Sequence, residues 1–253
     1  MRMAVAGGTG TVGRHVVEVA RDRGHEVLVL SRSAGVDLVG GTGLGSTLAG
    51  VDAVLDVASV MTQSAESSVR FFRAVTTHLL AAEERAGVPH HVALSVVGAD
   101  RAPWGYYAGK VVQEELVARG PVAWTLLRAT QFHEFAQQLH GQLGIGPLHA
   151  APVMRSQPVA AREVAERLVA LAEGAPAGRV PDLAGPEVLR MTDMVRSYAR
   201  AAGRGGFVLP VPLPGKLGRA FRDGTLTAGP GADLGVRTFA QWVAEVSRER
   251  VGR

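Results

Sequence analysis

Short apolar runs recur along the first half of the chain and alternate with segments of helical spacing. The runs are rich in Val and Leu, and they predict strands at 3–6, 26–30, 52–58, 91–97 and 122–127, with a further short one at 36–39. The segments between them predict helices at 11–23, 69–86 and 106–119. This alternation predicts a doubly wound parallel sheet over about residues 1–130, because parallel strands need crossover helices that cover both faces.

The second half of the chain has a less regular pattern. Helical spacing is found at 162–172, 193–202 and 238–250, and prolines at 210, 212 and 214 predict an extended segment. No repeat or flexible linker separates the two halves. We therefore expect a single α/β domain over residues 1–253. Its Rossmann-type dinucleotide-binding core is expected at 1–130, and residues 131–253 are expected to form mainly a small substrate lobe on the same sheet.

Composition excludes several classes of protein. Hydrophobic residues make up 47% of the chain and charged residues 20%, which excludes a disordered chain. The absence of cysteine excludes disulfides and fits a reducing compartment, so we expect a cytoplasmic protein. No run of 18 apolar residues is present, so we expect no membrane partner. The net charge is +4 and the pI about 10.1, but the arginines are scattered among Glu and Asp, so we expect no nucleic-acid partner.

Three glycines at a spacing of three separate the first predicted strand from the first predicted helix. Gly7 permits a tight turn, Gly10 lets the backbone approach a phosphate, and Gly13 lets the helix lie close to the strand. A dinucleotide pyrophosphate binds at such a helix N-terminus, where free N–H groups and the helix dipole favour anions. The predicted cofactor contacts in this loop are Gly7, Thr9, Gly10, Thr11, Val12 and Gly13.

The residues after the second predicted strand favour NADP(H), with NAD(H) as the alternative cofactor. An acidic residue there would accept a hydrogen bond from the adenosine ribose, but this chain has Arg32 between two serines. A guanidinium group binds a 2′-phosphate through a charge-assisted fork, and Asp37 can accept from the adenine amino group. The backbone after the strand at 52–58 is expected to line the cofactor. The predicted contacts of this second group are Ser31, Arg32, Ser33, Asp37, Ala58 and Ser59.

Tyr106 and Lys110 lie one turn apart at the start of the predicted helix 106–119, so they share a face. An ammonium group near a phenol lowers the pKa of the tyrosine and makes it a usable general acid or base. Lys110 can also hold the nicotinamide ribose, and Ser95, at the end of the preceding strand, can orient a substrate carbonyl. The alternative is that Tyr106 only packs at the helix start and that Lys110 is solvated.

Other side chains near these candidates are predicted to line the substrate space. One precedes the helix at 106–119, one lies at its start, and three follow the strand at 122–127, where packing in a loop or in the core is the alternative role. The predicted substrate-lining residues are Trp104, Tyr107, Gln131, Phe132 and His133. We expect no metal site, because His90 and His91 point to opposite faces of a strand and the other histidines lack a carboxylate-rich spacing.

These motifs resemble the short-chain dehydrogenase/reductase superfamily, and more closely its atypical, NmrA-like NAD(P)H-binding branch. The resemblance spans about residues 1–135, with a weaker likeness at WVAEV near the C-terminus. It implies a Rossmann sheet, a dinucleotide cofactor, a small-molecule substrate and Ser95, Tyr106 and Lys110 as the catalytic set. Dimers and tetramers are common in this superfamily, so a homodimer fits the resemblance. The residues on which the resemblance rests are GGTGTVG (7–13), Ala58, Ser59, Ser95, YYAGKVVQEELV (106–117) and residues 127–135.

Two functions fit this resemblance. The first is an NADP(H)-dependent oxidoreductase of a small carbonyl, enone or quinone, with Tyr106 as the proton donor, Lys110 lowering its pKa and Ser95 orienting the carbonyl. The second is a non-catalytic NADP-binding redox sensor. Ser95 precedes Tyr106 by only 11 residues, which is shorter than is typical of active short-chain reductases, and the chain shows no clear equivalent of their catalytic asparagine. Because of these departures, the redox sensor stays an alternative to the oxidoreductase.

Overall fold

The computed structural model describes residues 1–251, apart from the side chains of Ile145, Glu249 and Val251. The chain forms two compact units. Unit 1 comprises Met1–Arg128 and Arg162–Pro181, and unit 2 comprises Ala129–Ala161 and Asp182–Arg253. The helix that the sequence predicts at 162–172 therefore belongs to the unit that holds the glycine loop. No helix in the described part of the chain combines the length and apolarity that crossing a bilayer requires.

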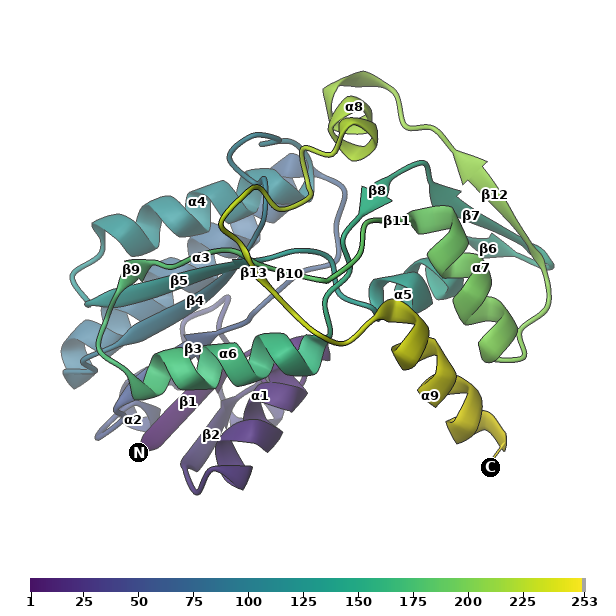
Figure 1. The fold of residues 1–253 in the computed structure, drawn as a ribbon. Coiled ribbons are helices and arrows are strands. Elements are labelled where there is room, and N and C mark those ends of the chain that lie inside the picture. The colour runs from purple at the N-terminus through teal and green to yellow at the C-terminus, as the bar shows by residue number, and fades with distance from the viewer. Residues whose placement is uncertain (252–253) are drawn as a thin grey trace. The chain divides into compact units, whose positions relative to one another are not determined.

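The central sheet of unit 1 confirms the predicted doubly wound parallel arrangement (Figure 1). Its strand order is β5-β4-β3-β1-β2, so the order reverses at β1. β1 pairs in parallel with β2 and β3, and β3 with β4. Ligands of such sheets bind at the carboxyl ends of the strands near this reversal. The strands are β1 (Arg2–Ala6), β2 (Glu26–Leu30), β3 (Ala53–Asp56), β4 (His91–Val96), β5 (Trp124–Ala129) and the short β9 (Gly178–Arg179), which pairs with β5.

Helices cover both faces of this sheet (Figure 1). One face carries α2 (Leu44–Thr47), α3 (Ala65–Ala86) and α4 (Tyr106–Arg119), and the other carries α1 (Thr11–Asp22) and α6 (Ala161–Glu173). Helices α3 and α4 pack closely, because a Cβ on Gly109 would overlap with Ser68 and Phe72. Ion pairs tie α6 to the α1 region, with Arg162 bound to Glu18.

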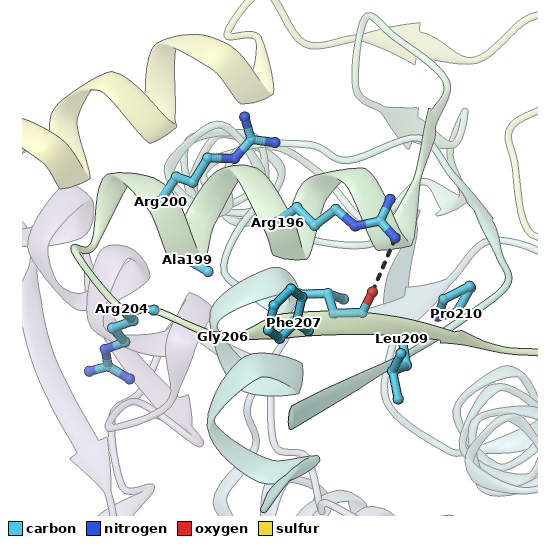
Figure 2. A pocket seen from close by; sticks show the side chains of 10 residues that line it. Arg196, Ala199, Arg200, Arg204, Gly206, Phe207, Leu209 and Pro210 are labelled. Atoms are coloured by element: carbon cyan, nitrogen blue, oxygen red, sulfur yellow. Dashed lines mark hydrogen bonds between the residues drawn. The ribbon is translucent and has the colours of Figure 1, made fainter. Parts of the chain in front are cut away.

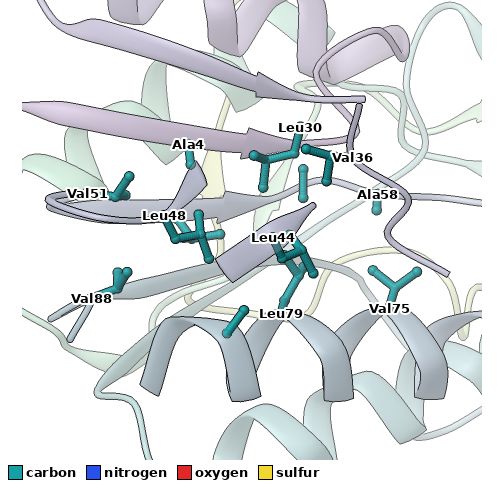
Figure 3. Packing of buried hydrophobic residues seen from close by; sticks show 13 residues of the cluster. Ala4, Leu30, Val36, Leu44, Leu48, Val51, Ala58, Val75, Leu79 and Val88 are labelled. Atoms are coloured by element: carbon teal, nitrogen blue, oxygen red, sulfur yellow. The ribbon is translucent and has the colours of Figure 1, made fainter. Parts of the chain in front are cut away.

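Alternation along the strands divides the core between the two faces. On the α3 face, Ala4, Leu30 and Val54 pack against Val75 and Leu79 (Figure 3). Burying a side chain such as Leu or Val stabilises the fold by about 1.5–3 kcal/mol. This packing fixes the ends of β1 and β3, from which the candidate site is built.

The predicted strand at 36–39 is wrong. After β2 the chain enters a 3₁₀ turn, η1 (Arg32–Ala34), and Asp37 then makes only one isolated bridge, to Thr42. Gly35 and Gly43 have φ of +78° and +79°, which turn the chain back on itself before a strand can extend. Helix α4, by contrast, has the predicted bounds 106–119, and α1 and α3 differ from the predictions only at their ends.

Unit 2 contains a three-stranded sheet in the order β12-β7-β6, with β12 parallel to β7 and β6 antiparallel to it. Helices α7 and α9 correspond to the predictions at 193–202 and 238–250, whereas α5 and α8 were not predicted. Edge-to-face and stacked rings of His140, Tyr198 and Trp242 form part of its core. The elements are α5 (Phe135–Gln142), β6 (Gly144–Ile145), β7 (Leu148–Pro152), β8 (Arg155–Ser156), β10 (Leu183–Ala184), β11 (Leu189–Arg190), α7 (Met191–Ala201), β12 (Phe207–Val211), α8 (Gly215–Asp223), β13 (Asp233–Leu234) and α9 (Phe239–Val251).

Candidate cofactor and catalytic site

The glycine loop joins β1 to α1, and two of its glycines are required by packing. Gly7 has a φ of +81°, and a Cβ there would lie 2.7 Å from the Ala58 Cα. A Cβ on Gly13 would overlap with the Gly7 carbonyl. Gly10 differs, because its φ of −80° suits any residue and its Cβ would meet only the Gly7 oxygen, at 3.2 Å. Gly10 therefore faces open space, where a ligand can approach.

The N-terminus of α1 is suited to bind an anion. Its N-cap residue is Gly10, so no side chain caps the first turn, and that turn contains no acidic residue. Uncapped N–H groups and the positive end of the helix dipole attract a phosphate. Thr9 and Gly10 are exposed there, whereas the side chain of Val12 is buried, so only the Val12 backbone can face a ligand. These features fit the pyrophosphate of a dinucleotide.

The residues predicted to select NADP(H) follow β2 at the same edge of the sheet. Ala6 pairs with Leu30, so the serine–arginine turn begins level with the glycine loop. Arg32 is exposed, and its guanidinium group forms no ion pair with any described carboxylate. The Oγ atoms of Ser31 and Ser33 lie 3.0 Å apart. These three side chains can converge on one phosphate group.

Asp37 is already used within its own turn. Its Oδ1 accepts the Val39 N–H at 3.1 Å, and its own N–H donates to the Thr42 carbonyl at 3.1 Å. An adenine amino group would have to share the carboxylate with this turn. The structure thus gives Asp37 a local structural role beside the predicted cofactor contact.

A buried carboxylate that the sequence analysis did not select fixes the end of β3. Asp56 is fully buried, and its Oδ1 accepts the Ala58 N–H at 3.0 Å. Its Oδ2 accepts from the Gln113 amide at 2.7 Å. Ala58 is the residue against which Gly7 packs, so Asp56 positions the backbone that faces the glycine loop. The signal for it was an acidic residue inside the apolar run at 52–58.

The hydroxyl of Tyr106 is hydrogen-bonded to Ser59, which follows β3, and not to Lys110. Its Oη lies 3.0 Å from the Oγ of Ser59, and its ring packs edge-on against Phe72 at a centroid distance of 5.6 Å. Burial raises the pKa of Tyr106 to about 12; the Ser59 hydrogen bond opposes the rise, and the negative charge of Asp56 adds to it. The predicted lowering of this pKa by Lys110 is therefore absent from the structure.

Lys110 is a buried cation with other partners. It is 3% exposed, and its Nζ donates to the Leu94 carbonyl at 2.8 Å and to the Gln113 side-chain oxygen at 2.7 Å. The Nζ also lies 4.3 Å from the centre of the Phe72 ring. Burial lowers the pKa of Lys110 to about 8, against the opposing charge of Asp56. Among the described residues no hydrogen bond joins Lys110 to Tyr106, so the predicted interaction of the pair is corrected: Lys110 links α4 to β4.

Ser95 is engaged in a separate, partly buried network. Its Oγ donates to Oε1 of Glu114 at 2.5 Å. Arg128 donates to both oxygens of Glu114, at 2.8 and 2.5 Å, and to Asp100 at 2.9 Å. Glu114 and Asp100 were not predicted, because their partners lie on other elements. The three catalytic candidates thus share one region of unit 1, but hydrogen bonds do not join them to one another.

The predicted substrate-lining residues fall in both units. Tyr107 is buried and Trp104 is partly buried at the start of α4 in unit 1. In unit 2, the Gln131 side chain accepts from Ser156 at 2.9 Å and donates to the Leu226 carbonyl at 3.3 Å. These bonds hold unit 2 together, so Gln131 has a structural role where the sequence suggested a substrate contact.

The two aromatic candidates of unit 2 also pack internally. Phe132 is partly buried and forms an isolated bridge with Val159. His133 is 0% exposed, and its ring packs against Phe239 and Trp242 at 5.7 and 5.9 Å. Burial lowers the pKa of His133 to about 4, so the ring is neutral. The structure therefore gives His133 the alternative role, packing.

The sequence model of a family described as NAD(P)H-binding matches residues 7–174. The match covers more than half of the chain and includes the glycine loop, Tyr106 and Lys110. The chain belongs to this NAD(P)H-binding family. The family assignment agrees with the open N-terminus of α1 and with the two glycines that packing requires.

Known proteins similar to this NAD(P)H-binding family member differ in function. The photosystem II assembly factor Ycf39 of Synechocystis is 27% identical over 235 residues, which cover 84% of this chain and 71% of Ycf39. A short-chain dehydrogenase/reductase superfamily protein from Agrobacterium tumefaciens with bound NAD has a TM-score of 0.68 at 20% identity, covering 100% of this chain and 98% of its own. The NADPH complex of quinone oxidoreductase QOR2 from Escherichia coli has a TM-score of 0.65 at 18% identity, covering 96% and 99%. The two solved structures confirm the predicted Rossmann-type fold.

Proposed function

We propose that this protein is an NADP(H)-dependent reductase of a small carbonyl, enone or quinone. The observation that carries the proposal is the hydrogen bond between Tyr106 and Ser59. Ser59 follows Ala58, which packs against Gly7, so a phenol is held beside the predicted cofactor loop. Bound NADPH supplies the hydride, and Tyr106 supplies the proton for the substrate oxygen.

The raised pKa of Tyr106 keeps its phenol protonated at neutral pH, which is the form that reduction needs. Ser59, rather than Lys110, orients the hydroxyl in this proposal. The hydroxyl proton of Ser95 is used by Glu114, so Ser95 is a weaker candidate to orient a carbonyl than the sequence suggested.

Among the three substrate classes, we favour a quinone. Its two-electron reduction takes the hydride of NADPH and a proton from Tyr106. The similarity in fold to QOR2, whose name states an NADPH-dependent quinone activity, supports the same class.

The test is an NADPH oxidation assay against a panel of quinones, enones, aldehydes and ketones, followed by loss of the reduced-nicotinamide absorbance. We expect turnover with at least one quinone, faster with NADPH than with NADH. Protein that binds NADPH but turns over no member of the panel contradicts the reductase.

That negative outcome would support the second candidate, an NADP-binding redox sensor. Two observations favour it: Lys110 is bound to Leu94, and Ser95 is bound to Glu114, so the usual catalytic set is not assembled. The 27% identity to Ycf39, which is named an assembly factor, supports the same alternative.

Arg32→Ala is expected to remove most of the preference for NADPH over NADH. A guanidinium fork on a 2′-phosphate is worth about 1.5–3 kcal/mol, so NADPH affinity should fall about tenfold to a hundredfold. NADH affinity should stay unchanged, because NADH has no 2′-phosphate. Fluorescence titration of both cofactors measures this, with Arg73→Ala, an exposed arginine of α3, as the matched control. Equal wild-type affinities for the two cofactors would contradict the assignment.

A further inference from the structure

The positive charge of the chain is concentrated in unit 2. Unit 1 contains 15 basic and 15 acidic residues, whereas unit 2 contains 12 basic and 8 acidic ones. Within unit 2, residues 190–222 contain seven basic residues and one acidic residue. Six of the 25 arginines are therefore gathered around α7, β12 and α8, with few acidic residues beside them.

Exposed apolar side chains lie beside these arginines. An open groove of about 480 Å³ runs between α7 and β12 and is lined by Arg196, Arg200, Arg204, Phe207 and Leu209 (Figure 2). Phe207 is 73% exposed and Leu209 is 49% exposed. Large apolar residues so close to unpaired charges are typical of interaction surfaces.

The arginines divide into one anchor and two free cations. Arg196 donates to Asp193 at 3.2 Å and to the Val208 carbonyl at 3.0 Å, which ties α7 to β12 (Figure 2). Arg200 and Arg204 are both exposed, and neither forms an ion pair with a described carboxylate. Arg200 lies in the last turn of α7 and Arg204 follows the end of the helix, so their side chains point to different sides (Figure 2).

The geometry of β12 limits how a partner can bind. β12 is an edge strand, but Pro210 lacks an N–H, and proline on an edge disfavours the addition of another strand. The groove also has buried Ala199 and Val208 in its floor, which a flat bilayer surface cannot reach. Recognition by side chains of a narrow, flexible segment fits both features.

We propose that this groove binds an acidic segment of a partner protein. An apolar side chain of the segment packs against Phe207 and Leu209, and its carboxylates pair with Arg200 and Arg204. A second open groove, of about 440 Å³, lies between α7 and α9 and shares Arg200 with the first. The proposal is independent of the reductase activity.

The test uses the full chain and a fluorescein-labelled peptide of about 12 residues in which Glu alternates with Leu and Phe. Fluorescence polarisation should show binding that weakens as salt is added. Arg200→Ala/Arg204→Ala should weaken binding about fivefold, and Phe207→Ser should have a similar effect. The control Arg73→Ala/Arg85→Ala removes the same charge from exposed positions of α3 and should leave the affinity unchanged.

Three results would overturn the proposal. The first is a peptide with Lys in place of Glu that binds equally well, or an acidic peptide that does not bind. The second is an equal loss of affinity in the α3 control. The third is that phosphatidylglycerol vesicles or single-stranded DNA bind in a way that depends on Arg200 and Arg204, whereas binding of the acidic peptide does not depend on these residues. NADPH titration of the groove variants should match wild type, which shows that they are folded.

Discussion

Tyr106→Phe is expected to lower turnover by about 10²–10⁴-fold, the usual worth of a positioned general acid. The substitution keeps the ring and its edge-on contact with Phe72, and it removes only the hydroxyl that faces Ser59. NADPH affinity should therefore change by no more than about twofold, because the phenol is not among the predicted phosphate contacts. Steady-state kinetics with a quinone and a fluorescence titration of NADPH separate the two effects.

Two controls sharpen this prediction. Tyr107→Phe removes a buried phenol on the neighbouring position of α4 and should cost far less turnover. Ser59→Ala should give an intermediate loss, because the phenol remains but its hydrogen bond is removed. A Tyr106→Phe variant that turns over like wild type would mean that water supplies the proton.

The pH dependence of the rate tests the same assignment. Burial raises the pKa of Tyr106 to about 12, so its proton is present at neutral pH and is lost only as the pH approaches that value. The ionisation of Tyr106 should therefore cause no fall in the reduction rate up to about pH 10. A fall with a midpoint near neutral pH that Tyr106→Phe abolishes would contradict the raised pKa of this phenol.

Local sequence signals predicted the parts of the site that depend on a single turn or helix. The bounds of α4 follow from helical spacing and from the glycine at 120. Gly7 and Gly13 follow from the close approach of one strand, one turn and one helix, all adjacent in sequence. Such features need no knowledge of distant contacts, and these predictions agree with the structure.

The partners of the catalytic candidates could not be predicted in the same way. Helical spacing places Tyr106 and Lys110 on one face of α4, but it does not tell which neighbouring element each side chain will contact. The pairing of the strands in the sheet determines the partner of each side chain. Ser59, which follows β3, bonds to Tyr106, and the Leu94 carbonyl of β4 accepts from Lys110. Asp56 completes this network from β3 through an amide of α4.

The prediction of a strand at 36–39, shortly after β2, was wrong for a different reason. Val36–Val39 has the composition of a strand, but the glycines on either side of it adopt positive φ and fold it into a turn. Propensity over four residues is a weak signal, and backbone geometry at Gly35 and Gly43 outweighs it.

Gly10→Val is expected to abolish most NADPH binding while the fold survives. The backbone at Gly10 is extended, with φ of −80° and ψ of −177°, which valine adopts readily. Its Cβ would meet only the Gly7 oxygen, so the branched side chain would occupy the open space at the N-terminus of α1. Loss of the phosphate contacts there should weaken binding at least about a hundredfold, or ~2.7 kcal/mol.

Gly13→Val is the matched comparison, because it adds the same side chain three residues later on the packed side of the loop. There the new Cβ would overlap with the Gly7 carbonyl and the Gly8 Cα, so the variant should lose stability rather than only affinity. Thermal unfolding should leave Gly10→Val within a few degrees of wild type and lower the midpoint of Gly13→Val strongly. If Gly10→Val binds NADPH as tightly as wild type, the phosphates lie away from this loop, and the uncapped N-terminus of α1 has another role.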